Sequence, residues 1–302
     1  KETNFVTSKE NTKMRKKLLL TLFLFLTSTI LITNGACIPA NFNIVSTKKV
    51  FPRQSFIFVE KKTVFFRCSD KNSICIPLHT GKMTGSASII HHRGDKTFLM
   101  TAAHLIWMLP IHPLHRMLLE KKGKLKWHST YTFIDINGKK HKLKKIIKSD
   151  KKTDLAIVAM ERSSLPALPL SRKAPEVKDR LFNIAAPAGV FETNMVPFFE
   201  GRFLGYSKKY FNMGKIALTN IPVAGGSSGS PILNCNGEIV GMVSAVHRAF
   251  HHISISPTHE QIFVFFHKHL LEYGYGYCAL PSSGEEAARR AFENSGKQSR
   301  RH

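Results

Sequence analysis

AGGSSGSP, residues 224–231, is the most informative segment of this 302-residue chain. A serine hydroxyl on a glycine-rich turn can act as a nucleophile, because glycine adopts sharp-turn backbone angles and leaves room for a carbonyl group beside it. Backbone N–H groups of such a turn can stabilise the oxyanion that forms during acyl transfer. The apolar pair Ile232 and Leu233 follows at once, which indicates a buried strand. Ser228 is therefore the candidate nucleophile, and an ordinary Ser/Gly-rich turn between strands is the alternative.

Two segments further upstream supply a histidine and an aspartate. The apolar run 98–100 leads through Thr-Ala-Ala to His104, and Asp154 stands directly before the apolar run 155–160. A single histidine among 15 is more often structural, and an aspartate before a strand is often a turn residue. Asp135 and Asp150 lie in the same interval as Asp154, but neither precedes a comparable apolar run.

Taken together, the three segments resemble the trypsin-like serine peptidase family over roughly residues 84–271. Ser227 stands where many digestive members carry Asp, and Ser230 stands where Gly is commoner. The chain therefore looks closer to the bacterial, viral and Deg-type branches. The resemblance implies an all-β fold of two antiparallel six-stranded β-barrels with the active site between them, and a C-terminal helix.

The resemblance also implies a role for each site residue. Ser228 attacks the peptide carbonyl, His104 takes up and returns the proton, and Asp154 holds the imidazole in one tautomer. The N–H groups of Gly226 and Ser228 form the oxyanion hole. The substrate-binding residues would be Pro222, Ser244, Ala245 and Val246, with Ser244 also supporting the aspartate. No Asp or Glu occurs in residues 201–236, so cleavage after small or medium apolar residues is expected.

The rest of the chain consists mainly of short β-rich runs separated by turn signals such as Asn137-Gly138 and Asn236-Gly237. Such spacing is typical of barrels and sandwiches. A single helix is expected near the end, because Thr258 offers a start signal and apolar residues follow at helical spacing up to Leu270. Strands are expected in ten segments: 56–59, 63–66, 86–90, 97–100, 131–134, 155–158, 181–184, 201–204, 216–218 and 238–243.

The beginning of the chain has the pattern of a secretory signal. Basic residues 15–17 precede the uncharged apolar run 18–32, and small residues follow. A membrane anchor is the alternative, although spanning a bilayer takes about 20 residues. We expect a secreted, periplasmic or other extracytoplasmic location, in which Cys68 and Cys75 could close a small disulfide loop. The expected segments are 1–36 for the upstream residues and signal, 37–83 for an extension with the first strands, 84–272 for the peptidase domain and 273–302 for a tail.

The formal net charge of +25 leaves other functions open. Lysine doublets such as Lys61-Lys62 are interpreted as solvated faces, with no dedicated nucleic-acid site, although association with anionic surfaces is possible in principle. The partner expected is a protein or peptide substrate, with no cofactor and no metal. Three alternatives remain: a catalytically inactive binding protein of the same fold, a basic protein that binds nucleic acid or membrane surfaces, and an enzyme with a different acyl acceptor, as an esterase or a protease that processes only itself.

Overall fold

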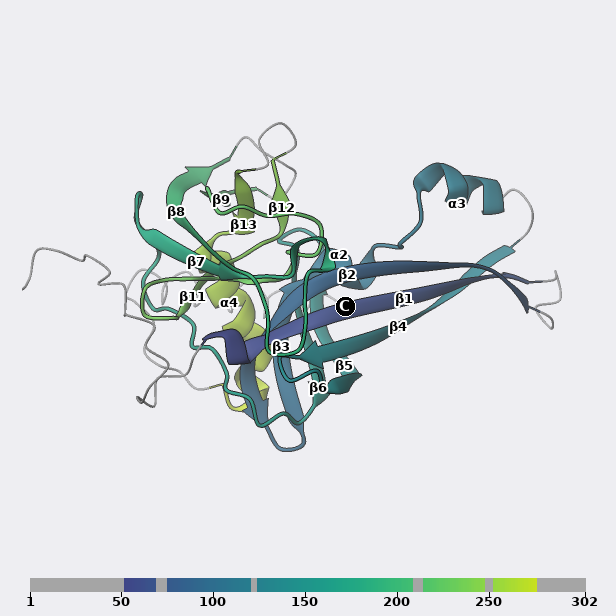
Figure 1. The fold of residues 1–302 in the computed structure, drawn as a ribbon, viewed down its shortest axis with the longest axis horizontal. Coiled ribbons are helices and arrows are strands. Elements are labelled where there is room, and N and C mark those ends of the chain that lie inside the picture. Colours follow the sequence, from purple (N-terminus) through teal and green to yellow (C-terminus); the bar gives the residue numbers. More distant parts are fainter. Residues whose placement is uncertain (1–51, 69–74, 121–123, 209–213, 248–251, 276–302) are drawn as a thin grey trace, which may run out of the picture. The chain divides into compact units, whose positions relative to one another are not determined.

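The computed structural model describes residues 52–68, 75–120, 124–208, 214–247 and 252–275 (Figure 1). They belong to one compact unit, residues 48–302. The expected signal or anchor segment 1–36 and most of the expected tail lie outside the described residues. Within the described residues, no helix has the length and apolar character needed to cross a membrane.

The first half of the described chain forms a closed barrel with strand order β1-β2-β3-β6-β5-β4. β3 and β6 carry the apolar runs around the predicted His and Asp, and both are almost entirely buried. The elements of this half are η1 (Pro52–Ser55), β1 (Phe56–Cys68), β2 (Cys75–Arg93), β3 (Lys96–Ala102), α2 (Ala103–Trp107), α3 (Pro113–Glu120), β4 (Lys124–Asp135), β5 (Lys140–Asp150) and β6 (Leu155–Glu161).

The second half forms a seven-stranded sheet with order β11-β10-β7-β8-β9-β13-β12. Its edge strands β11 and β12 are consecutive in the chain, separated only by Val243 and Ser244. The elements are β7 (Arg180–Ile184), η2 (Pro187–Gly189), β8 (Phe198–Ser207), β9 (Ile216–Thr219), β10 (Pro231–Leu233), β11 (Ile239–Met242), β12 (Ala245–Val246), β13 (Ser254–Pro257), α4 (His259–Leu270) and η3 (Leu271–Tyr273).

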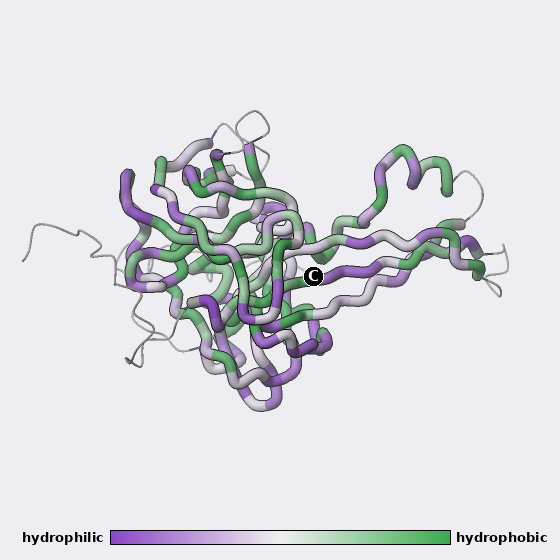
Figure 2. Tube along the Cα trace, in the orientation of Figure 1, coloured by the Kyte–Doolittle hydropathy of each residue, from purple (hydrophilic) through white to green (hydrophobic). Residues whose placement is uncertain are grey.

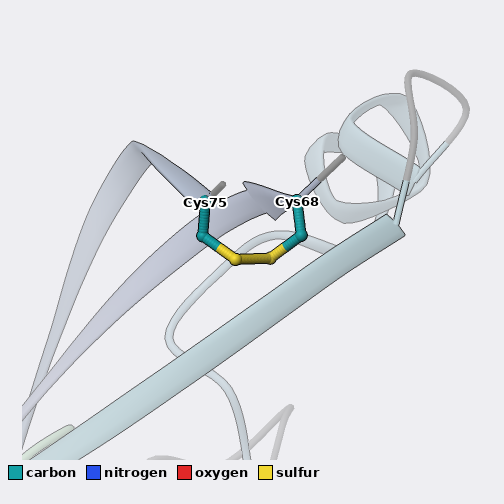
Figure 3. Close-up of a disulfide and its surroundings, with 2 residues drawn as sticks. All are labelled: Cys68 and Cys75. Carbon is teal, nitrogen blue, oxygen red and sulfur yellow. A yellow bond between two sulfur atoms is a disulfide. The ribbon is translucent and has the colours of Figure 1, made fainter. Parts of the chain in front are cut away.

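Three strands run well beyond the barrel. β1 pairs with β2 and β4 along its full length, whereas β3 pairs with β2 only at residues 87–93 and β5 pairs with β4 only at residues 132–134. The outer parts of β1, β2 and β4 therefore form a three-stranded ribbon, called the arm below (Figure 1). A disulfide between Cys68 and Cys75 joins β1 to β2 at its tip, which confirms the loop that the cysteine spacing suggested (Figure 3).

The helix expected near the end of the chain is α4. Its N-cap is Thr258, whose hydroxyl accepts from the N–H of Gln261, while the Gln261 side chain accepts from the N–H of Thr258. This reciprocal capping box satisfies two N–H groups that the first helical turn leaves without intrahelical partners. Ile262, Phe266 and Leu270 bury one face of α4 in the main core cluster, next to β6 and β11.

The architecture agrees with the sequence prediction in part. The first six-stranded barrel and the closing helix are present, but the second sheet has seven strands among the described residues and is not closed. A second six-stranded barrel is therefore not confirmed. β1 lies inside the range 37–83 expected as an extension with the first strands, and it is a full member of the closed barrel.

Candidate active site

His104 stands just beyond the end of β3, a strand that is buried except at Lys96. β3 delivers it to the second position of α2, where its side chain remains 21% exposed. Its Nδ1 forms a hydrogen bond of 2.8 Å with Oδ2 of Asp154. This contact fixes the proton on Nδ1 and turns Nε2 towards an incoming proton donor, which is the arrangement a general base needs.

Asp154 orients the histidine through both its backbone and its carboxylate. It occupies the turn before β6 with a φ of +57°, an unusual conformation for a residue other than glycine. Its carbonyl oxygen accepts from the N–H of Ala103, and its Oδ1 accepts from the N–H of His104. Two first-turn N–H groups of α2 are thereby satisfied by one residue. Ser244 donates its hydroxyl hydrogen to Oδ2, the same oxygen that His104 contacts.

Ser228 lies on the loop between β9 and β10, and Ser86 of β2 holds that loop against the barrel. The N–H of Ser86 donates to the carbonyl of Ser228, and its hydroxyl donates to the carbonyl of Gly226, each at 2.8 Å. The carbonyl of Ser86 accepts from the hydroxyl of Thr101, three residues before His104. One buried serine thus connects the Ser228 loop to the strand that carries the histidine.

Two glycines of the Ser228 loop lie where a side chain would collide with neighbouring backbone. Gly229 has a φ of +88°, and a Cβ added there would lie 2.1 Å from the carbonyl oxygen of Ser86. Gly226 has a φ of +97°, and its Cβ would lie 2.3 Å from the carbonyl oxygen of Ala186. Among the described residues, the N–H groups of Gly226 and Ser228 donate no hydrogen bond within the chain. An oxyanion hole needs such N–H groups, and the role of Gly226 and Ser228 as its donors stays a prediction.

Of the two contacts expected within the triad, the structure has the one between His104 and Asp154 and lacks the one between Ser228 and His104. No hydrogen bond joins the Ser228 hydroxyl to the His104 ring among the described residues. Ser228 is partly exposed. In unliganded sites such contacts are often long and shorten when substrate binds.

Within the same described ranges, no three His, Cys, Asp or Glu side chains gather closely enough to hold a metal ion.

Lys61 holds the far end of the helix that carries His104. Its ammonium group donates to the carbonyl oxygens of Ile106 and Met108 at 2.8 and 2.7 Å, where α2 ends. Tyr131, its cross-strand neighbour on β4, donates its hydroxyl to the same Ile106 oxygen at 2.9 Å. Burial lowers the pKa of Lys61 to about 8 and raises that of Tyr131 to about 12.

The interpretation of the Lys61-Lys62 doublet as a solvated face is therefore wrong for Lys61. Its side chain points inward and the residue is 2% exposed, whereas Lys62 is exposed. The reason is the strand period of two, which sends neighbouring side chains to opposite faces of β1. The carbonyl partners come from a distant helix end, so no local pattern in the sequence marks Lys61.

The four residues expected to bind substrate differ in their surroundings. Ser244 is buried and engaged with Asp154, while Ala245 and Val246 on β12 are partly buried. Val246 packs against the core cluster of the second sheet. Pro222, expected at the base of the primary pocket, is exposed. The role of these residues in binding substrate stays a prediction.

Residues 85–242 match a protein-family model described as a trypsin-like peptidase domain. A curated relative, the probable periplasmic serine endoprotease DegP-like of Hahella chejuensis, is 28% identical over 116 residues. That match covers 38% of this chain and 24% of the relative, so the chain spans only about a quarter of the relative's length.

Two crystal structures share the fold. The active form of the Rv3671c protease from M. tuberculosis superimposes with a TM-score of 0.50 and 14% identity, covering 76% of this chain and 84% of that protein. The serine endoprotease from Yersinia pestis gives a TM-score of 0.51 and 16% identity, covering 75% of this chain and 68% of that protein. At these identities the likeness concerns the fold alone.

Proposed function

Because the chain belongs to the trypsin-like peptidase family, we propose that it is a serine endopeptidase whose triad is His104, Asp154 and Ser228. The observation that carries the proposal is the arrangement around Asp154. One carboxylate oxygen accepts from Ser244 and contacts Nδ1 of His104, while the other accepts from the His104 backbone. A carboxylate held by three partners has one orientation, and so has the imidazole that it contacts.

In the proposed reaction, the Ser228 oxygen attacks the carbonyl carbon of the substrate while its proton passes to Nε2 of His104. The negative charge that develops on the substrate oxygen is stabilised by the N–H groups of Gly226 and Ser228. Asp154 stabilises the imidazolium, which then protonates the leaving amine as the peptide bond breaks. Water attacks the acyl-enzyme by the same route in reverse, releasing the second product and restoring the Ser228 hydroxyl.

We further propose that the peptidase domain reaches to residue 272 and begins at β1 rather than at residue 84, because β1 closes the barrel, and that the protein works outside the cytoplasm. The basic and apolar residues 14–32 and the Cys68–Cys75 disulfide support that location, as does the periplasmic relative. The proposed substrates are proteins or peptides cut after small or medium apolar residues. The support is the lack of Asp or Glu in residues 201–236, because a cationic side chain buried there would lack a counter-charge.

The decisive experiment compares the full chain with Ser228→Ala and with the matched control Ser164→Ala, which changes an exposed serine outside the site. A fluorophosphonate probe should label the native protein and the control but not Ser228→Ala. Peptide cleavage should fall by several orders of magnitude in Ser228→Ala alone. A folded native protein that neither reacts with the probe nor cleaves a diverse peptide library would be a binding protein instead.

The specificity proposal has its own measurement. Matched tetrapeptide substrates that differ only at the residue before the cut should rank Ala, Val, Leu or Thr above Lys and Arg in kcat/KM. A clear preference for Lys or Arg would refute this assignment of the pocket and leave the triad unaffected.

A further inference from the structure

Strand β5 and the turn that follows it carry a concentration of lysine. Residues 139–152 contain eight Lys, one Asp and no Arg or Glu. All eight lysines are exposed, and none of them forms an ion pair with a carboxylate of the described residues. Figure 2 shows β5, found by its label in Figure 1, mostly in the hydrophilic colour. The segment is therefore a strongly positive part of the barrel surface.

The first two lysines of β5 lie on the outer face of the barrel. His141, between Lys140 and Lys142, is buried and is directly opposite Phe133 of β4. Phe133 belongs to the cluster that fills the barrel. Because neighbouring residues of a strand point to opposite faces, Lys140 and Lys142 point outward.

Two β-bulges keep the next two lysines on the same face. Lys145 is directly opposite Ala159 on β6, and Lys148 is directly opposite Ile157. Ala159 and Ile157 belong to the core cluster into which α4 packs, and not to the cluster that fills the barrel. Directly opposed side chains lie on the same side of a sheet, so both lysines point outward. Plain alternation would turn Lys145 inward, three residues after Lys142, and the bulges supply the extra residues that prevent this.

The lysine row, defined here as Lys140, Lys142, Lys145 and Lys148, has uncharged neighbours on both sides. The residues directly across from it are Ile134 and Thr132 on β4 and Ala159 and Ile157 on β6. Like charges held along one strand repel each other, and no carboxylate directly across from them relieves the repulsion. An anionic partner would supply the missing negative charge.

One end of the lysine row meets the candidate active site. β5 ends at Asp150, and the turn after it leads to Asp154. In that turn the ammonium group of Lys151 lies 5.0 Å from the centre of the Trp107 ring. Trp107 is the last residue of α2, the helix that carries His104. A polypeptide bound at the candidate site can therefore continue along the row on the surface of the same barrel.

We propose that the lysine row binds an acidic segment of the protein substrate, next to the part that is cut. This role rests on the peptidase function proposed above. Outward positions of a strand recur roughly every 7 Å, and alternate residues of an extended peptide recur at the same spacing, so Asp or Glu at such positions can each meet a lysine. The positive row also speeds the capture of an acidic substrate, and this effect weakens as salt is raised.

The composition of the row favours an acidic peptide over two other anionic partners. A surface that docks on a membrane adds apolar groups that insert between the lipids. A surface that binds single-stranded nucleic acid adds aromatic rings on which bases stack. The four outward positions carry lysine alone, and β5 contains no Phe, Tyr or Trp.

The first test compares kcat/KM for peptides that share one cleavable sequence. One peptide has a block of Glu attached through a flexible Gly-Ser linker, and its partner has Gln in place of each Glu. Both are made with the block before the cut and with the block after it. On the side that faces the row, the Glu peptide should be cut with a kcat/KM roughly tenfold or more higher than the Gln peptide at low salt. This ratio should fall towards one as salt is raised.

Two variants with the same loss of charge assign the effect to the row. The row variant carries Lys142→Gln, Lys145→Gln and Lys148→Gln. The control variant changes three exposed lysines of the second half of the chain: Lys173→Gln, Lys178→Gln and Lys208→Gln. The ratio of kcat/KM between Glu and Gln peptides should fall close to one in the row variant and stay at the native value in the control variant.

A second measurement does not depend on catalysis. Fluorescence anisotropy follows the binding of a labelled Glu-block peptide to the full chain carrying Ser228→Ala. Binding should be lost when the row variant is added to this chain and kept when the control variant is added. Binding to the row by a chain that cleaves no peptide would refute the peptidase function and retain the acid-binding surface.

Three results would overturn the proposal. The first is an active chain with equal kcat/KM for the Glu and Gln peptides in both arrangements, which would leave the triad unaffected. The second is a ratio that falls equally in the row variant and the control variant, because net charge alone would then be the cause. The third is tighter binding of a single-stranded DNA oligonucleotide or of phosphatidylglycerol vesicles than of the Glu peptide, lost in the row variant, which would assign the row to that partner.

Discussion

Gly229 and Ser86 are in direct backbone contact, although they belong to different halves of the fold. A Cβ atom added to Gly229 would fall 2.1 Å from the carbonyl oxygen of Ser86 and 2.5 Å from the hydroxyl of Thr101. Both atoms are buried and hydrogen-bonded to each other. Neither can move aside without disturbing the strand that carries His104.

Gly229→Ala should therefore lower kcat strongly, although it adds only one methyl group. The methyl group would push the Ser228 loop off the barrel, and a displacement of this kind can cost about a hundredfold in kcat. The φ of +88° adds backbone strain of roughly 1 kcal/mol or more. Gly225→Ala is the control, because no atom lies within 4 Å of its added Cβ. Steady-state kinetics and urea unfolding measure both effects, and equal kcat values for the two variants would contradict this explanation.

Asp154→Asn should reduce turnover by about 10⁴-fold while the protein remains folded. The amide nitrogen of Asn cannot accept a hydrogen bond, so the imidazole is no longer held with its proton on Nδ1. Asp95→Asn, which changes an aspartate whose side chain is 72% exposed, should leave kcat unchanged.

Asp150→Asn tests the assignment of the acid more closely. The Asp150 carboxylate accepts from the Lys152 N–H and the Thr153 hydroxyl, and so stabilises the turn before Asp154. Loss of the Asp150 carboxylate should lower the free energy of unfolding and change kcat little. A variant at Asp150 as inactive as Asp154→Asn would show that the acid has been assigned wrongly.

Lys61 should make stability depend on pH in the alkaline range. Its pKa is about 8 in the folded protein and 10.5 when unperturbed, so between these values the unfolded chain binds a proton that the folded chain does not. The free energy of unfolding should therefore rise with pH across this window, by on the order of 3 kcal/mol at most. Urea midpoints measured across the window check this. Lys61→Met should remove the rise, and Lys62→Met should retain it.

Acid should destabilise the protein through its histidines. Burial is the main cause that lowers the pKa of His92, His259, His267 and His269 below the ordinary value of 6.5. Below pH 6.5 the unfolded chain takes up protons that these folded side chains resist, so the free energy of unfolding falls.

His259 offers a specific test of that effect. It is 6% exposed, and its Nε2 lies 2.7 Å from the carbonyl oxygen of Ser171. His259→Gln should lower stability at neutral pH but flatten the loss between pH 6.5 and more acidic values. Unfolding curves that are independent of pH below 6.5 in the native chain would be inconsistent with the lowered pKa values.

Much of the fold could be predicted from local patterns. Every expected strand lies in an observed strand or at its margin, because alternating or continuous apolar runs such as 155–160 become buried strands. α4 was predictable because Thr258 and Gln261 form a capping box that depends only on neighbours in sequence. The contact of Asp154 with His104 was implied by the resemblance to the trypsin-like peptidases, not by either motif alone.

The features that were missed depend on residues distant in sequence or on strands without an apolar pattern. β5 reads KHKLKKIIKSD, and most of its lysines are exposed, so no buried face marks it as a strand. Ser86 and Lys61 act on carbonyl groups of residues 226, 228, 106 and 108, which only the folded chain brings near. The second sheet is open between its edge strands β11 and β12, and the strand pattern does not specify whether these two edges pair.

The bonds from Ser86 to Gly226 and Ser228 also set an order of events while the chain is being made. The closed barrel ends at Glu161, long before the ribosome reaches the loop that carries Ser228. Since the barrel supplies the partners that shape this loop, the nucleophile acquires its geometry only on a barrel that already exists. The Ser228 loop also depends on a later residue, because the N–H of Gly229 donates to the carbonyl of Val243, so the proposed site is complete only after residue 243 has been made.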